Sequence, residues 1–237
     1  MVSSHSLEAG PGAATRRGLW LLPLAGIILA VVTLLWLVPL PGATANATLA
    51  DQARMMASPL VLIVFGWLYF VGLIVLILGL QALYGVLAAG HGRAWALGGL
   101  ALGVAGAAVL LAAFGAVALG GAVVAGSYLG GNTGAADAMQ HLQGGSFGAA
   151  VMQALVVAII LAVAGAIAEG VAIWRSGTLP RWAAIVFGVG LVLVAASTPL
   201  VTTLGGLLLL ASGVAIARAT GREAIAGEAA PAALQPA

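Results

Sequence analysis

Only one Asp, Glu, Arg or His side chain, that of Glu169, occurs within the six long apolar stretches of this chain. These stretches account for about 150 of the 237 residues, and all other charged or His side chains lie in the tails and connections. A charge at the centre of a bilayer costs at least about 2.5 kcal/mol. The distribution therefore predicts an all-α, polytopic transmembrane helical bundle.

The composition supports a membrane protein and excludes several other classes. Charged residues make up 6% of the chain and hydrophobic residues 63%, whereas an average soluble domain has roughly 25% charged residues. The eight basic residues are all Arg and are scattered, so they form no stripe that would follow nucleic-acid phosphates. Cysteine is absent, which excludes disulfides and thiolate ligands. The Lys-free, Ala- and Gly-rich usage is typical of a GC-rich bacterial genome.

The lengths of the apolar stretches predict six spans within a domain covering residues 18–217. A helix needs about 20 residues to cross the hydrocarbon core, because it rises 1.5 Å per residue. Ser197-Thr198-Pro199 interrupts the last stretch, which predicts a hairpin of two short spans, although one kinked span over 182–217 is an alternative. The tails, 1–17 and 218–237, are expected to be disordered. The predicted spans are 19–40, 59–89, 95–129, 147–174, 182–197 and 200–217.

The arginines predict that both termini are cytoplasmic. With six spans, seven Arg fall on the side of the termini and Arg54 alone falls on the other side, which is a strong positive-inside bias. The seven are Arg16, Arg17, Arg93, Arg175, Arg181, Arg218 and Arg222. Trp20, Trp95, Trp174 and Trp182 lie within three residues of one of them. We expect a multi-pass protein of the bacterial inner (plasma) membrane.

Glu169 is the first candidate for a functional residue because it is alone. The favoured interpretation is an interfacial carboxylate that snorkels or pairs with a nearby Arg, since polar groups near span ends cost little. The alternative is a carboxylate that faces a cavity and binds a cation or a lipid amine. Gln81 and Tyr84, in the second span, are the other polar candidates at this depth.

The two external loops, 42–58 and 130–146, each contain a short segment that is compatible with a helix. Thr48-Leu49-Ala50-Asp51 resembles a capping box with Asp in place of Glu. Asp137 and His141 are four residues apart and share a helical face. Asp51, Asp137 and His141 are a possible metal site. We favour the alternative, in which they are solvated groups on two amphipathic caps.

Glycine-rich faces predict close helix packing, either within the chain or against another copy or subunit. The chain has 35 Gly residues, and Gly99-x-x-x-Gly103 and Gly126-x-x-x-Gly130 place small residues on one face. Such faces let helices approach closely in lipid.

The missing motifs argue against an enzyme. The spans contain no His for haem ligation and no pair of Asp, and the chain has no H-E-x-x-H motif and no Walker loop. A membrane Ser nucleophile would need a His or Lys base, and His141 belongs to an external loop. We therefore expect no catalytic residues, no cofactor and no ion-transport machinery.

The segment Trp174-Arg175-Ser176-Gly177-Thr178-Leu179-Pro180-Arg181-Trp182 resembles the loop before the last two spans in a family of uncharacterised bacterial six-span membrane proteins. The resemblance covers about 40 residues, supports the topology and implies no activity. Our expectation is a structural or accessory subunit, or an interaction scaffold. The alternative is a transporter or binding protein for an apolar or amphiphilic ligand such as a lipid. The expected partners are membrane lipids, other membrane subunits or a second copy, and no nucleic acid.

Overall fold

The computed structural model describes residues 12–35, 48–195 and 198–229, and every regular element within these ranges is a helix. Two of the elements, η1 and η2, are π-helical segments inside longer helices. In chain order the described elements are α1 (Ala13–Gly18), α2 (Leu21–Leu35), α3 (Leu49–Met56), α4 (Pro59–Val61), η1 (Leu62–Leu68), α5 (Tyr69–Leu87), α6 (Arg93–Gly115), η2 (Ala116–Gly120), α7 (Gly121–Leu129), α8 (Gly134–Gly144), α9 (Ser146–Ser176), α10 (Arg181–Ala195) and α11 (Pro199–Ala229).

Five of the described helices are long and apolar enough to cross a membrane. One joins α4, η1 and α5, another joins α6, η2 and α7, and the remaining three contain α2, α9 and α11. The sixth apolar helix, α10, has 15 residues, or about 22 Å at 1.5 Å per residue. The all-helical fold is therefore confirmed for the described residues.

The helix bounds follow the predicted apolar stretches closely. The helices over Pro59–Leu87, Arg93–Leu129 and Ser146–Ser176 begin and end within two residues of the prediction. Two differences concern the tails. The helix α1 lies in a segment predicted to be disordered, and α11 continues past residue 217 to Ala229. Residues 36–40 of the first predicted span and 42–47 of the first external loop lie outside the described residues, as do 196–197 of the predicted break.

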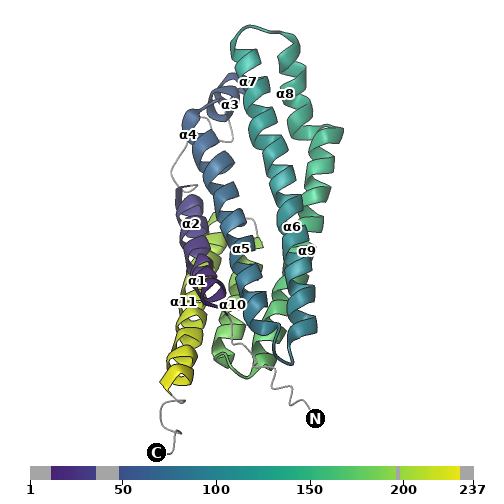
Figure 1. Ribbon diagram of the computed structural model, residues 1–237. Coiled ribbons are helices and arrows are strands. Elements are labelled where there is room, and N and C mark those ends of the chain that lie inside the picture. The colour runs from purple at the N-terminus through teal and green to yellow at the C-terminus, as the bar shows by residue number, and fades with distance from the viewer. Residues whose placement is uncertain (1–11, 36–47, 196–197, 230–237) are drawn as a thin grey trace, which may run out of the picture.

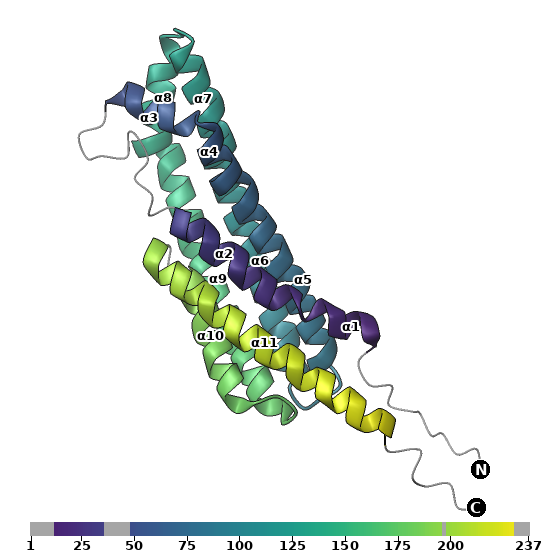
Figure 2. The same ribbon diagram turned by 90° about the vertical axis from the view of Figure 1, so that its left-hand side faces the viewer.

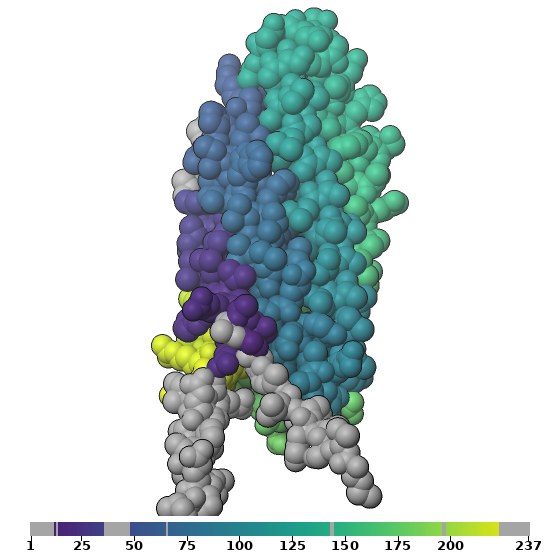
Figure 3. Space-filling model, viewed as in Figure 1, coloured from purple at the N-terminus to yellow at the C-terminus, as the bar shows by residue number. Residues whose placement is uncertain are grey.

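The bundle has two ends of different thickness. The helices α2, α10 and α11 pack together at the end where α1 lies, and they cover only part of the length of α5, α6 and α9 (Figures 1 and 2). The long helices continue past them to the other end, where the short helices α3 and α8 pack against α7. In Figure 3 the blue and teal residues rise well above the purple ones. We call these ends the six-helix end and the cap end.

Close backbone contact between α6 and α9 explains why the six-helix end is tightly packed. A Cβ added at Gly165 of α9 would lie 2.9 Å from the Gly103 nitrogen, and one at Gly106 would lie 3.0 Å from the Ala162 nitrogen. The Gly99-x-x-x-Gly103 face is therefore used within the chain. In contrast, a Cβ at Gly126 would have nothing within 4 Å, so Gly126 leaves its side of α7 open.

Two residues determine the turn between α9 and α10. Gly177 ends α9 in the left-handed conformation, with φ of 69°, which an L side chain adopts only with strain. Pro180 directly precedes α10. The turn returns the chain alongside α9, and α10 then packs on both α9 and α11. Two helices are thus present in the described ranges after residue 181, as predicted. The first, α10, is short, but α11 has 31 residues and is longer than predicted. The residues at their break are not all described.

Candidate functional site

Glu169 lies on the buried face of α9 and is 1% exposed. Neither of its carboxyl oxygens has a hydrogen-bond partner in the described part of the chain. Its position is made possible by Gly99 of α6, because a Cβ at residue 99 would lie 2.7 Å from Glu169 Cγ and 3.0 Å from Cδ. Where α6 and α9 are in contact, the Glu169 side chain therefore packs directly against Gly99.

A cavity of about 50 Å³ adjoins the Glu169 side chain. It lies between α5, α6, α9 and α10, and every other described residue that lines it is a glycine or has an aliphatic side chain. The lining residues are Leu73, Leu76, Leu80, Gly99, Gly103, Ala107, Leu110, Ala162, Gly165, Ala166, Glu169, Leu191, Val194 and Ala195. We call this space the Glu169 cavity. An ionised carboxylate would have no charged partner there, which costs several kcal/mol in a low-dielectric interior.

The prediction that Glu169 snorkels or pairs with an Arg is wrong, because the side chain is buried and its oxygens have no partner among the described residues. The other two polar candidates at this depth do not join it. Gln81 is exposed, and Tyr84 is half-buried against the apolar core. Neither residue lines the Glu169 cavity. The sequence singled out Glu169 but predicted the wrong surroundings for its side chain.

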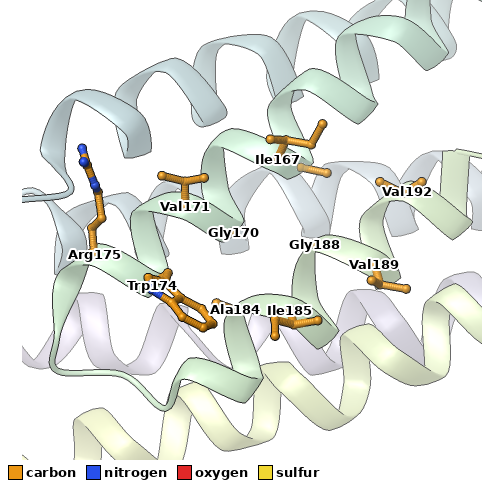
Figure 4. A pocket seen from close by; sticks show the side chains of 11 residues that line it. Ile167, Gly170, Val171, Trp174, Arg175, Ala184, Ile185, Gly188, Val189 and Val192 are labelled. Carbon is orange, nitrogen blue, oxygen red and sulfur yellow. The ribbon is translucent and has the colours of Figure 1, made fainter.

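A second hollow lies on the outside of the bundle, between α9 and α10. This groove has a volume of about 470 Å³, which is within the range of about 300–1,000 Å³ for ligand pockets. Trp174 and Arg175 lie at one end of the groove and Val192 at the other (Figure 4). Its lining residues are Ala166, Ile167, Gly170, Val171, Trp174, Arg175, Ala184, Ile185, Gly188, Val189 and Val192. Arg175 is the only charged residue among them.

The small residues in the floor of the α9–α10 groove explain its depth. A Cβ at Gly188 would lie 3.4 Å from the Ala166 oxygen, and one at Gly170 would lie 3.4 Å from the Ala184 oxygen. These are ordinary contact distances, so a methyl group at either position would fit without separating the helices. At the charged end, the Arg181 guanidinium lies 5.6 Å from the Trp174 ring centroid, within reach of a cation–π contact.

The predicted capping box at the cap end is confirmed. The Asp51 N–H donates to the Thr48 hydroxyl at 3.2 Å, and the Thr48 N–H donates to Asp51 Oδ2 at 3.2 Å. Arg54 Nη1 lies 3.0 Å from Asp51 Oδ1. Hydrogen bonding from Thr48 holds the pKa of the Asp51 carboxyl below its usual value, and Arg54 acts in the same direction. Asp51 therefore stabilises the start of α3.

The structure gives no support to a metal site in the loops. Asp137 and His141 are both exposed on α8, and the His141 ring nitrogen Nδ1 lies 2.8 Å from the Asp137 backbone oxygen. Among the described residues, no three His, Cys, Asp or Glu side chains come together in a group that could hold a metal ion. Beneath these loops, Ala53, Ala125 and Met139 form a small apolar core that joins α3, α7 and α8.

One buried polar contact was missed by sequence reasoning. The hydroxyls of Thr33 in α2 and Thr203 in α11 lie 2.9 Å apart. Their distance in the sequence gives no pairing signal, and Thr is common in apolar helices because its hydroxyl bonds to its own helix. The Thr33 hydroxyl lies 2.8 Å from the Leu29 oxygen, and the Thr203 hydroxyl lies 2.8 Å from the Pro199 oxygen. Each hydroxyl has one proton, so one of the two donates to the other hydroxyl while that one donates to its own helix.

The comparisons with known proteins identify no relative from which a role for these residues could be taken. No family model, curated protein or solved structure matches the chain.

Proposed function

We propose that this chain is a six-span membrane protein that binds an anionic amphiphile, such as a phospholipid, in the groove between α9 and α10. The observation that carries the proposal is the groove itself, which is apolar along its length and has Arg175 and Trp174 at one end. An acyl chain would lie along the apolar part, and an anionic headgroup would meet the guanidinium. This is a ligand-binding role that needs no buried charge.

The topology that the proposal requires has both termini in the cytoplasm. Its support is the seven-to-one distribution of Arg and the meeting of α1, the start of α6, the end of α9 and the start of α10 at the six-helix end (Figures 1 and 2). Trp20, Trp95, Trp174 and Trp182 are all exposed, as expected for aromatic anchors at a membrane surface. The headgroup end of the groove then lies at the inner surface of the plasma membrane.

Single cysteines test this orientation cleanly because the chain has none. Thr178 and Thr133 are exposed residues in connections at opposite ends of the bundle. Thr178 is a better position than Gly177, whose positive φ would strain a Cys. In intact cells, an impermeant thiol reagent should label Thr133→Cys and not Thr178→Cys. The reverse pattern would contradict the orientation.

The lipid proposal is tested by native mass spectrometry of the full chain purified in mild detergent with an anionic phospholipid. Gly188→Leu should fill the groove and reduce the lipid-bound fraction severalfold. Gly98→Leu is the matched control, because a Cβ at Gly98 has nothing within 4 Å and Gly98 does not line the groove. Unchanged lipid binding in Gly188→Leu, or equal losses in both variants, would contradict the proposal.

The contact between Arg175 and the lipid headgroup is tested separately, with Arg93 at the same end of the bundle as the control. Arg175→Gln should weaken retention of an anionic phospholipid more than that of a zwitterionic one, because a charge-assisted hydrogen bond is lost. Arg93→Gln removes the same charge from the start of α6, outside the groove, and should have little effect. Equal effects of the two variants would indicate general attraction to the anionic membrane rather than a site.

A second candidate function is that of a self-associating subunit or scaffold. Val123 and Gly126 lie on one face of α7, and Gly130 follows directly after the helix. Val123 is 73% exposed and Gly126 has open space. Small residues on such a face favour helix association in lipid. Light scattering in mild detergent should give a complex larger than one chain, which Val123→Arg should dissociate and Leu97→Arg on α6 should not. A single chain throughout would contradict this role.

A further inference from the structure

We propose that Glu169 and the cavity beside it form a proton-binding site inside the membrane-spanning bundle. The carboxyl carries its proton while α6 packs against it and releases the proton to water when α6 and α9 separate. The site does not depend on the α9–α10 groove, because Glu169 lines the inner cavity and is not among the groove residues. A proton is the ligand class because it needs no ligand besides the carboxylate, whereas a metal ion needs several oxygen ligands that this lining does not offer.

The first support is the isolation of the carboxyl group. Glu169 is 1% exposed, and both oxygens lack hydrogen-bond partners. A buried polar group without partners carries a desolvation cost, and the cost is far larger for an ion than for a neutral acid. A side chain that served only to fill this space would be better replaced by an aliphatic one. Packing alone therefore does not explain why residue 169 has a carboxyl group.

The second support is the absence of other ligands around the cavity. Its lining from α5 and α10 consists of Leu, Val and Ala side chains, and that from α6 consists of Gly, Ala and Leu. Among the residues that the structure describes, no titratable, hydroxyl or amide side chain of these helices faces Glu169 across the cavity. A sodium or calcium ion takes several oxygen ligands, which this lining does not supply. Proton binding requires only the carboxylate itself.

The third support is the space available beside the carboxyl. A cavity needs about 10–15 Å³ to hold one water molecule, and the Glu169 cavity has about 50 Å³. A water molecule that entered would accept the proton as the carboxyl O–H bond breaks. The bonding electron pair stays on the carboxylate, and the hydronium carries the positive charge away. Return of the proton reverses this step, so no oxidant or reductant is needed.

The contact of α6 with α9 determines where the site would open. Gly99 packs directly on Glu169, and a Cβ added there would also lie 2.9 Å from the Glu169 nitrogen. Because no side chain interlocks at this position, the two helices can separate without a side chain having to leave its rotamer. Glu169 is also about two helical turns from the end of α9 at Ser176, so water has a short path from the six-helix end.

The first test is the thermal stability of the full chain in detergent, measured from mildly acidic to alkaline pH. The folded chain binds a proton at Glu169 that the unfolded chain has lost, so its stability falls as the pH rises above the ordinary range of a glutamate. Glu169→Gln mimics the neutral acid and should remove this fall. Asp137→Asn, which alters an exposed carboxylate, should keep it. The same pH dependence in the wild type and in Glu169→Gln would overturn the proposal.

The second test uses the unaltered chain and does not depend on the folding of a variant. A hydrophobic carbodiimide, added to membranes at neutral pH, reacts with protonated carboxyl groups. The acid adds across the carbodiimide C=N bond, its proton moves to nitrogen, and the acyl group then migrates to give a stable N-acylurea. Peptide mass spectrometry should find the adduct on Glu169 and not on Asp51 or Asp137. An unmodified Glu169 would overturn the proposal, because its carboxyl group would then be ionised or inaccessible to the reagent.

Discussion

Asp51 at the cap end and Glu169 at the six-helix end are both single carboxyl groups, yet their surroundings are opposite. Asp51 is partly exposed and interacts with Thr48 and Arg54. Glu169 is buried, and neither oxygen has a partner. The first carboxylate stabilises a helix start at little cost, because water and a cation surround it. The second has no structural partner in this conformation, which is why we assign it a chemical role.

The largest loss of stability is expected from a substitution at Gly99, the glycine against which Glu169 packs. Gly99→Ala would place a methyl group 2.7 Å from Glu169 Cγ, and such overpacking typically costs about 1–3 kcal/mol. Gly98→Ala is the neighbouring control, with nothing within 4 Å of its Cβ. It should gain up to about 1 kcal/mol from helix propensity.

Denaturation of both variants in the same detergent measures the difference. The free energy of unfolding should be higher than the wild type's in Gly98→Ala and lower in Gly99→Ala. If Gly99→Ala were as stable as Gly98→Ala, the close contact between α6 and the Glu169 side chain would be wrong.

An intermediate effect is expected at Thr203, which is buried like Glu169 but paired like Asp51. Thr203→Val removes the 2.9 Å contact with the Thr33 hydroxyl while keeping a β-branched side chain. Hydrogen bonds between membrane helices contribute about 0.6 kcal/mol on average, so the loss of stability should be of this size. A double-mutant cycle with Thr33→Val measures it, and a coupling energy of zero would show that the two hydroxyls do not interact.

The smallest effect is expected at Asp51. Since its pKa lies below the usual value, the ionised group stabilises α3 at neutral pH, and this contribution is lost as the pH falls through the lowered pKa. Asp51→Asn should therefore speed hydrogen exchange in α3 slightly at neutral pH, relative to intrinsic rates, and leave α9 unchanged. At acid pH the variant and the wild type should converge. A difference that persisted at acid pH would show that the charge of Asp51 is not its source.

The sequence predicted the helices well because hydropathy alone identifies apolar segments of this length. It also predicted the capping box, since Thr48 and Asp51 interact within one turn. It could not predict the surroundings of Glu169, which depend on how α6 and α9 rotate about their axes. Gly99 and Glu169 are 70 positions apart, and in a chain with 35 Gly nothing singles out Gly99 as the residue opposite the carboxyl.

The groove and the contact between Thr33 and Thr203 were missed for the same reason. Both form between helices whose relative positions are set by packing rather than by local sequence. The turn at Gly177 and Pro180 was visible as a loop. However, the hollow that it leaves between α9 and α10 depends on the small residues Gly170 and Gly188 meeting across the two helices. Periodicity shows that such residues share a face but not which helix they will meet.

The central claim, that Glu169 is a neutral acid among apolar side chains, is tested most directly by infrared difference spectroscopy. The C=O stretching band of a protonated carboxylic acid is well separated from carboxylate bands. In spectra of the full chain at neutral pH, the wild type minus Glu169→Gln should show one carboxylic-acid band. The wild type minus Asp51→Asn should show carboxylate bands and no carboxylic-acid band. A carboxylate signal and no carboxylic-acid band in the Glu169 difference would contradict the account.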